Sequence, residues 1–506
     1  MFDYILQGAT HIFTQPMVML ISVLGVVIGI IVGALPGLTA TMGVALLLPV
    51  TFGMEPVSGL MLLSGVYFGG VYGGSITAIL LRTPGTPAAA ATAIDGYALT
   101  QKGMAGQALG TATLSSTIGG ILSVIVLMFL SPVLANLALE FSAPETFALA
   151  VFGLSIITSI SGKSILKGLI AGTGGLLVAT IGLDPILGLP RYTGGIEELM
   201  NGIPYIPVMI GLFAAAEAFK TLEEAAVGEK VKAKIERILP TWYHFKKMLP
   251  TILRSSGLGV LIGIIPGAGG DIAAFVSYNE AKRFSKEKEE FGKGKLEAVA
   301  ACESGANGCT GGAFIPLLTL GIPGDSVTAV MLGALLVQGL QPGPMLFTNN
   351  GELVYTLFVG MLFCYIVMFV LGLLAARYFA KVVEIPKSIL TPVILVLCIV
   401  GSYAINNSFF DVGIMLVSGV IGYFMQKKDF PASPIVLALI LGPMAESQFR
   451  RSLALSDGSY DIFFTRPITC LLLVLSLITL FTPIIKSVLN NKRSAKQSIQ
   501  GTHTSE

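Results

Sequence analysis

Charged residues are scarce in this chain, and their scarcity excludes most classes of soluble protein. Asp, Glu, Lys and Arg together make up 12% of the 506 residues, whereas hydrophobic residues make up 54%. A soluble domain carries about a quarter charged residues, so the composition predicts a polytopic membrane protein. The net charge of +2 favours neither nucleic acid nor an acidic partner.

Histidine is missing where membrane chemistry would need it. The three histidines, His11, His244 and His503, lie outside the apolar stretches, which removes the commonest proton shuttle and metal ligand. No cysteines form a Cys-x-x-Cys pair, and we interpret the five as small buried thiols: Cys302, Cys309, Cys364, Cys398 and Cys470. We therefore predict no catalytic residue and no metal site, and a membrane-embedded enzyme acting on a hydrophobic substrate remains the weaker alternative.

Lys and Arg are also absent before residue 17, where Asp3 is the only charged residue. A cleaved signal peptide begins with a basic region, so we expect the first apolar segment to be retained.

Helix-length apolar stretches occur in two series. The first lies near residues 57–81, 106–130, 146–161, 165–183 and 204–219, and the second near 297–320, 352–376, 388–404, 409–425, 432–445 and 467–487. The pattern predicts an all-α fold with the following parts: an N-terminal segment 1–17, a first transmembrane repeat 18–219, a linker 220–254, a second repeat 255–450, and a last helix and tail 451–506.

The linker is the one long polar insert, and its basic residues place it in the cytoplasm by the positive-inside rule. Glu223, Glu224, Glu229 and Glu236 dilute that charge, so a nucleic-acid interface is the weaker interpretation. The basic-free start, the basic linker and the basic tail together predict two inverted halves. Arg450 and Arg451 would then lie outside, which counts against this orientation.

Pairs of Pro and Gly interrupt the apolar stretches at matching places in the two halves. Pro36-Gly37 corresponds to Pro266-Gly267, and Pro84-Gly85 corresponds to Pro323-Gly324. Pro-Gly pairs break helices. Paired helix breaks in two halves of a membrane protein are the best sequence pointer to a transporter's binding site.

The second break lies between two basic islands, the linker and the segment KRFSKEKEEFGKGK that begins at Lys282. The apolar arms on either side of Pro266 are each too short to span a bilayer. We therefore predict a re-entrant hairpin over 256–280, which keeps both islands on one side, and a matching hairpin over 18–52.

The side chains at the breaks suit a carboxylate and a small cation. Freed N–H groups at the start of a half-helix favour anions, and freed carbonyls favour cations. The predicted substrate-binding residues are Pro36, Gly37, Thr39, Thr41, Arg82, Thr83, Thr86, Gly267, Asn307, Pro323, Gly324 and Ser326. The predicted ion-binding residues are Asp271, Ser304 and Asp325, with Na⁺ or H⁺ as the coupling ion.

Each of these residues also has a structural interpretation. Arg82 could extend to the membrane interface rather than bind a carboxylate, and Asp271 and Asp325 could simply cap helices. The glycines of the apolar stretches favour close helix packing, and Ser and Thr usually bond to their own helix. Glu303 could be interfacial.

The glycine-proline segments resemble those of the TctA family, the large membrane subunit of the tripartite tricarboxylate transporters. The resemblance covers residues 18–450 and rests on GALPGLTATMGVALLLP, GGVYGGSITAILLRTPGTPAA, GIIPGAGGDIAAFVSY and GGAFIPLLTLGIPGD. It implies a permease of the bacterial inner membrane that works with a small four-helix membrane subunit and a periplasmic solute-binding protein.

The same resemblance implies cation-coupled uptake of citrate or another organic acid, without ATP. We expect an elevator-like secondary transporter, in which one layer moves against a scaffold that also supplies the contact of a possible homodimer. A passive anion channel is a further alternative.

Overall fold

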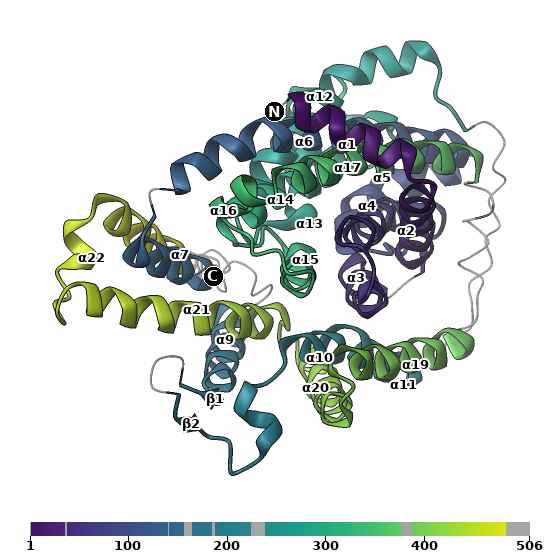
Figure 1. Ribbon diagram of the computed structural model, residues 1–506. Helices are drawn as coiled ribbons and strands as arrows, with labels where there is room; N and C mark the ends of the chain where they lie inside the picture. The colour runs from purple at the N-terminus through teal and green to yellow at the C-terminus, as the bar shows by residue number, and fades with distance from the viewer. Residues whose placement is uncertain are drawn as a thin grey trace, which may run out of the picture. The chain divides into compact units, whose positions relative to one another are not determined.

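The computed structural model describes residues 2–35, 38–139, 141–155, 164–184, 188–223, 238–375, 378 and 387–481. These residues are helical except for short connections and one antiparallel pair of two-residue strands, β1 (Gly182–Leu183) and β2 (Pro190–Arg191) (Figure 1). Six of the described helices are long and apolar enough to cross a membrane. The prediction of an all-α polytopic membrane protein is therefore confirmed.

Packing divides the chain into two compact units, and each takes segments from both predicted repeats. Unit 1 comprises Met1–Glu140 and Pro204–Phe424, and unit 2 comprises Phe141–Ile203 and Met425–Glu506. The helices of unit 1 are α1 (Phe2–Thr14), α2 (Pro16–Ala34), α3 (Ala40–Leu47), α4 (Pro56–Leu81), α5 (Ala90–Gln101), α6 (Ala105–Ala138), α10 (Tyr205–Met209), α11 (Ala216–Glu223), α12 (Trp242–Ile264), α13 (Gly269–Phe284), α14 (Leu296–Leu320), α15 (Ser326–Val337), α16 (Pro344–Asn349), α17 (Gly351–Leu374) and α19 (Lys387–Asn406). A π-helical segment, Ile210–Ala215, joins α10 to α11, and α20 (Phe409–Lys427) ends just past the unit boundary.

Glycines join α2 and α4 into a parallel pair within unit 1. A Cβ at Gly25, Gly29 or Gly33 of α2 would collide with the backbone of Leu62, Val66 or Gly70 of α4. The partners advance together by four residues, so the two helices run in the same direction. Small residues at this spacing let helix backbones approach closely, which is the packing role expected for these glycines.

The second predicted repeat builds the same pair from α12 and α14. A Cβ at Gly259 would meet the Gly305 carbonyl, and one at Gly263 would meet the Cys309 carbonyl. The connections that follow α2 and α12 match as well: Leu38 N–H donates to the Leu35 carbonyl at 3.1 Å, and Ala268 N–H donates to the Ile265 carbonyl at 3.2 Å.

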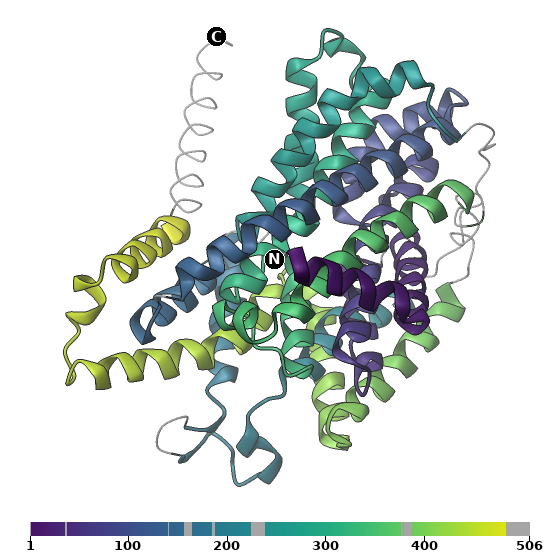
Figure 2. The same ribbon diagram turned by 45° about the horizontal axis from the view of Figure 1, so that its top comes forward.

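The two pairs run in opposite directions. Along α4, Phe68 contacts Phe314 of α14, whereas Tyr72, one turn further on, lies near Glu303 of α14. As the residue number increases along α4, the residue number of its contact on α14 therefore decreases, so the two helices are antiparallel. Figures 1 and 2 show α2, α3 and α4 lying together, and α12, α13 and α14 lying together. This antiparallel arrangement is the one that inverted repeats predict.

The helix α12 begins earlier than predicted, at Trp242 rather than within 256–280, so the linker does not extend to residue 254. The Thr241 side chain caps it by accepting from His244 N–H at 3.3 Å. With 23 residues, α12 is about 34 Å long, but it is not among the described helices that are apolar enough to cross a membrane. The basic side chains of α12 made this segment look like a polar linker in the sequence. One face of the helix is nevertheless buried, with the residue spacing of an amphipathic helix: Met248, Thr251, Ile252, Ser255, Ser256, Gly259, Val260 and Gly263.

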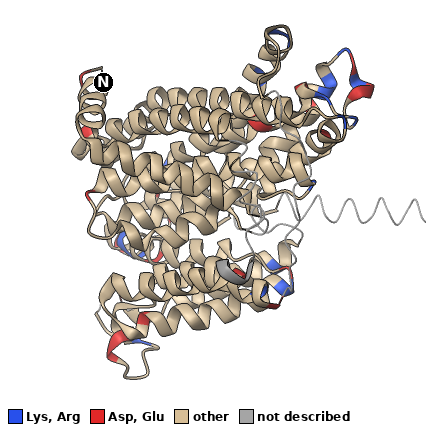
Figure 3. Cartoon of the chain, turned by 90° about the vertical axis from the view of Figure 1, so that its right-hand side faces the viewer, with Lys and Arg blue, Asp and Glu red and all other residues tan. Residues whose placement is uncertain are grey.

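Both basic islands nonetheless meet at the same end of this hairpin. The Lys247 ammonium lies 3.1 Å from the Glu287 carboxylate, and Thr251 donates to Glu297 at 2.8 Å. The helix α13 therefore returns the chain to the end where α12 began. Figure 3 shows that charged residues gather in loops and at helix ends, as expected when helix sides face lipid.

Unit 2 is held by ion pairs as well as by helix packing. Its elements are α7 (Ala143–Ser155), α9 (Ile165–Ala179), β1, β2, α21 (Ser433–Leu455), α22 (Ile462–Thr465) and the apolar helix Pro467–Phe481. Arg191 lies 2.7 Å from Glu446, and Arg450 lies 2.9 Å from Asp184. The charge of Arg450, which counted against the predicted orientation, is thus paired within the protein.

Candidate functional site

The chain folds back sharply where α4 and α14 end. After α4, Gly85 N–H donates to the Gly74 carbonyl at 3.3 Å, and a Cβ at Gly85 would collide with the Gly33 carbonyl. After α14, a Cβ at Gly324 would meet Ala313 and the Gly263 carbonyl. Each Pro-Gly break therefore lies against its own hairpin helix, and only glycine fits there.

The tip of the first hairpin reaches the break of the second repeat. Thr39 caps α3, accepting from Met42 N–H at 3.2 Å. Two residues further on, the Thr41 hydroxyl is hydrogen-bonded to that of Ser326 at 3.0 Å. Because Ser326 is the first residue of α15, the N-termini of α3 and α15 meet at this bond. Pro36 and Gly37 lie outside the described residues.

Asp325 organises the start of α15. One carboxylate oxygen accepts from Thr328 N–H and from the Thr328 hydroxyl, each at 2.8 Å, and Asp325 N–H donates back to that hydroxyl. The other oxygen accepts from the Tyr67 hydroxyl of α4 at 2.5 Å. Asp325 is therefore a helix cap, as one interpretation of the sequence held, and it also links the two repeats.

Asp271 lies beside Asp325 at the tip of the second hairpin. Both side chains lie near Gly269, which has a φ of +71°. A Cβ added to Gly269 would lie 2.7 Å from an Asp271 Oδ atom and 4.0 Å from the Asp325 Cβ. Asp271 is exposed and belongs to the first turn of α13, where Ala268 occupies the cap position without a side-chain bond. The tip of the second hairpin is also hydrogen-bonded to the Pro-Gly break after α14, because Gly267 N–H donates to the Gly324 carbonyl at 2.7 Å.

Arg82 caps α4 in a left-handed conformation with φ +63°. Gly321, at the same place after α14, has φ +71°. The Arg82 side chain is exposed, and its guanidinium forms no ion pair with the described part of the chain. Thr83 follows, half-buried, with its hydroxyl bonded to the Leu81 carbonyl at 3.4 Å.

Three predicted residues make no described hydrogen bond to either hairpin tip. Thr86 is buried beside Gly74, with no described partner for its hydroxyl. Ser304 donates to the Ala300 carbonyl of its own helix at 2.7 Å, and Asn307 donates to that of Glu303 at 3.1 Å. Ser304 and Asn307 thus follow the usual behaviour of short polar side chains in membrane helices.

Sequence reasoning missed two residues of this region. Tyr67 lies in an apolar stretch, and nothing in its spacing signals the bond to Asp325. Glu303, for which an interfacial position was one interpretation, is buried inside α14 with its side chain 2% exposed. A carboxylate in the middle of an apolar, glycine-rich helix was the available signal, since such residues are rarely placed there without a function.

The meeting point can attract ions of both signs. Two helix N-termini converge at Thr41 and Ser326, and their dipoles favour an anion there. Asp271 and Asp325 supply negative charge next to the same turn, where backbone carbonyls are also free of helical bonds. Within the described residues, no three His, Cys, Asp or Glu side chains gather as a metal site.

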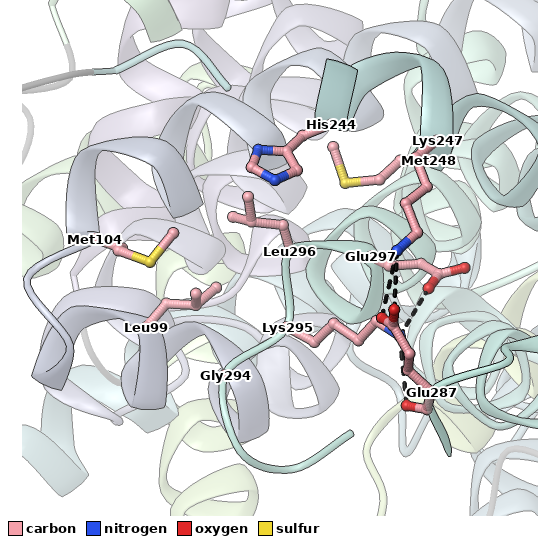
Figure 4. Close-up of a pocket in the computed structure, with 10 residues that line it drawn as sticks. All are labelled: Leu99, Met104, His244, Lys247, Met248, Glu287, Gly294, Lys295, Leu296 and Glu297. Carbon is pink, nitrogen blue, oxygen red and sulfur yellow. Dashed lines mark hydrogen bonds and ion pairs between the residues drawn. The ribbon is translucent and has the colours of Figure 1, made fainter. Parts of the chain in front are cut away.

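A separate cavity of about 210 Å³ lies at the other end of the second hairpin. Figure 4 shows Lys247 and Lys295 pointing toward Glu287 and Glu297 on one side of it. Its remaining lining comes from Leu99, Met104, His244, Met248, Gly294 and Leu296. It is smaller than a typical ligand pocket, and the length of α12 separates it from the tip, so it is not the meeting point of the breaks.

Helix breaks that bring two half-helix starts together at one polar point are a feature of transporters built from discontinuous membrane helices. The comparison with known families agrees. The chain belongs to the tripartite tricarboxylate transporter TctA family, whose model matches residues 19–437.

Two relatives come from Agrobacterium vitis. One, described as an uncharacterized 52.8 kDa protein in the TAR-I ttuC' 3'region, is 38% identical over 467 residues, which is 92% of each chain. The other, an uncharacterized protein in the TAR-II ttuC' 3'region, is 37% identical over 230 residues, covering 46% of this chain and 95% of the relative. No solved structure matches the chain.

Proposed function

We propose that this protein is the permease subunit of a secondary active transporter that takes up tricarboxylates or related organic acids across the bacterial inner membrane. The observation that carries the proposal is the 3.0 Å bond between Thr41 and Ser326. It joins the N-termini of two half-helices from the two repeats, which is where an anionic substrate group binds in transporters of this architecture.

In the proposed site, a substrate carboxylate lies between the starts of α3 and α15. The hydroxyls of Thr39, Thr41 and Ser326 and free N–H groups donate to it. Arg82 provides positive charge for a further carboxylate, since its guanidinium is exposed and not neutralised by a described acid. Bidentate pairing with carboxylates is the characteristic use of arginine.

A coupling cation binds near Asp271 and Asp325 in this proposal. The Asp271 carboxylate and the Asp325 Cβ lie near Gly269, next to unwound backbone that can supply carbonyl oxygens. A cation there offsets repulsion between the acids and the anionic substrate, so binding of one ligand favours binding of the other. That mutual dependence is the physical basis of symport.

We further propose that a small four-helix membrane subunit and a periplasmic solute-binding protein work with this chain, and that a homodimer forms through the later helices of each half. Family membership supports a tripartite system. Substrate crosses when the hairpin-bearing helices move, or rock, as one layer against those later helices.

Radiolabelled uptake by the reconstituted complex, across a panel of mono-, di- and tricarboxylates, tests the proposal. We expect uptake of at least one organic acid against its gradient when a Na⁺ or proton gradient is imposed, and none when the gradient is collapsed. Uptake that ignores the gradient would indicate a passive channel. Failure of every carboxylate in the panel would contradict the proposal.

A further inference from the structure

Glu303 is a buried carboxylate that the proposed substrate site does not use. It lies in α14, where every residue from Ala298 to Thr319 is buried. One carboxylate oxygen accepts from the Thr92 hydroxyl of α5 at 2.6 Å, and the other from the Ser116 hydroxyl of α6 at 2.9 Å. No cationic side chain pairs with it among the described ion pairs. We propose that Glu303 binds and releases the coupling proton of transport.

The hydrogen-bond partners of Glu303 differ in kind from those of the neighbouring buried acid, Asp95. The Asp95 carboxylate accepts from the backbone N–H groups of Gly292, Gly294 and Lys295, at 2.8–3.0 Å, and from the Tyr278 hydroxyl. A backbone N–H can only donate, so these backbone partners offer no acceptor for a proton on the Asp95 carboxylate. Its role is to fix the loop before α14.

A hydroxyl can either donate or accept, so the partners of Glu303 satisfy both of its forms. When the carboxylate takes up a proton, its new O–H donates to one hydroxyl oxygen, and that hydroxyl turns its own hydrogen toward a carbonyl of its helix. When the proton leaves, both hydroxyls turn back to the carboxylate. No backbone movement is needed. A charge in this interior is costly, and two neutral donors offset only part of that cost.

Among the described residues near Glu303, the other carboxylate, Asp95, is already bound by backbone N–H groups. The titratable groups that face Glu303 are Tyr72 on α4 and Cys302 on its own helix. Asp95 on α5 and Tyr278 on α13 are bonded to each other and lie near Cys302. The helix α6 presents hydroxyls, including Ser115, which has no described partner. A proton arriving in this interior therefore has Glu303 as its natural acceptor.

Glu303 is one helical turn from the second hairpin tip. The Ala306 carbonyl lies 3.5 Å from the Cβ position of Gly270, the residue before Asp271. Three residues of α14 advance about 4.5 Å, so a change at Glu303 is transmitted to the tip through a single turn. This inference rests on the proposed function but changes its coupling site: the coupling ion is H⁺ rather than Na⁺, and its carrier is Glu303, one turn away from Asp271 and Asp325.

Two measurements on the reconstituted complex test it. Infrared difference spectroscopy follows the C=O stretch of a buried protonated carboxyl as pH is raised, and needs no substrate. Uptake of radiolabelled citrate, or of the panel acid carried best, is then driven by an imposed pH gradient. The variant is Glu303→Gln, which imitates the protonated form. The matched control is Glu352→Gln, the same change at an exposed position on α17.

We expect the carboxyl band to disappear with rising pH in the native protein and in Glu352→Gln, and to be absent from Glu303→Gln. Accumulation driven by the pH gradient should be lost in Glu303→Gln alone. Ser116→Ala and Thr92→Val, which remove a bond to the carboxylate, should each shift the midpoint of the band to higher pH. These two substitutions keep the test available if Glu303→Gln does not fold.

Several results would overturn the inference: no titrating band, a band that persists in Glu303→Gln, or pH-driven accumulation that survives this substitution. Transport coupled only to Na⁺ would also overturn it. If the band titrates as expected but no organic acid is carried, the proton site stands and the proposed function fails. If acids are carried without the band, the inference fails and the proposed function stands.

Discussion

Arg82 is a residue whose backbone conformation has a cost. Its φ of +63° places it in the left-handed region, where its counterpart Gly321 has φ +71°. A residue with a Cβ pays about 1–2 kcal/mol there, and glycine does not. Strain of this kind persists where the side chain has a use, which supports the carboxylate-binding role over a merely interfacial one.

Two substitutions of Arg82 separate strain from charge. Arg82→Gly should raise the free energy of unfolding by about 1 kcal/mol and lower carboxylate uptake, because the strain and the guanidinium both disappear. Arg82→Gln should lower uptake equally without stabilising the protein. Thermal unfolding in detergent and vesicle uptake measure the two effects. Uptake that is unchanged in both variants would remove Arg82 from the site.

Sequence reasoning worked at this scale when a residue type was tied to a backbone need. The Pro-Gly pairs predicted the breaks, and the structure places Gly85 and Gly324 where a Cβ does not fit. The sequence did not reveal the role of Tyr67 or the burial of Glu303. A bond such as that between Tyr67 and Asp325 depends on which helices pack together, and sequence alone does not show this.

At the scale of elements, the helix pairs depend on which face each glycine occupies. Gly257 and Gly259 both lie in α12, but only Gly259 faces α14, where a Cβ would collide with the Gly305 carbonyl. Around Gly257 no atom lies within 4 Å of the Cβ position. The same substitution at these two positions therefore has opposite effects.

Gly259→Ala should destabilise the protein by about 1–3 kcal/mol, because α12 must move away from α14. Gly257→Ala should stabilise it by up to about 1 kcal/mol through helix propensity alone. Thermal unfolding of the two variants in the same detergent measures the difference. Equal melting temperatures would show that α12 and α14 do not pack as described.

The polar end of the second hairpin should respond to acid. Hydrogen bonds from Lys247 and Lys295 lower the pKa of the Glu287 carboxyl below its usual value. A lowered pKa in the folded state means that the ion pairs stabilise the protein above the unfolded pKa and stop doing so as pH falls through the folded one. Since Glu287 is exposed, the effect is small.

The melting temperature of Lys247→Gln should therefore lie slightly below that of the native protein at neutral pH, and the gap should close below about pH 4. Lys282→Gln, which removes an exposed charge from the same region, is the control and should show no such gap. A gap that widens in acid would contradict the assignment of this ion pair.

Most helix spans could be predicted from apolar length, but the start of α12 could not. The first half of α12 is rich in basic and polar residues, so its composition is that of a linker. Only the buried stripe from Met248 to Gly263 reveals a packed helix. Nor does sequence reveal the two packing units, because they combine segments that are distant along the chain.

At the scale of the whole molecule, the proposed site draws residues from both predicted repeats. Thr41 is 7% exposed and contacts Ser326 of the other repeat, and Asp325 bonds to Tyr67 of the first. Neither repeat holds a complete set of anion donors alone. We therefore propose that the two half-helix N-termini form a single binding site for a carboxylate.

A double-mutant cycle in radiolabelled uptake tests that claim most directly. Thr41→Val and Ser326→Ala should each reduce uptake by about tenfold, the value of one hydrogen bond to a charged group. Because both donors serve one ligand, the double variant should be much less impaired than the product of the two single effects predicts. Full uptake in either single variant, or independent effects that multiply in the double variant, would contradict a shared site.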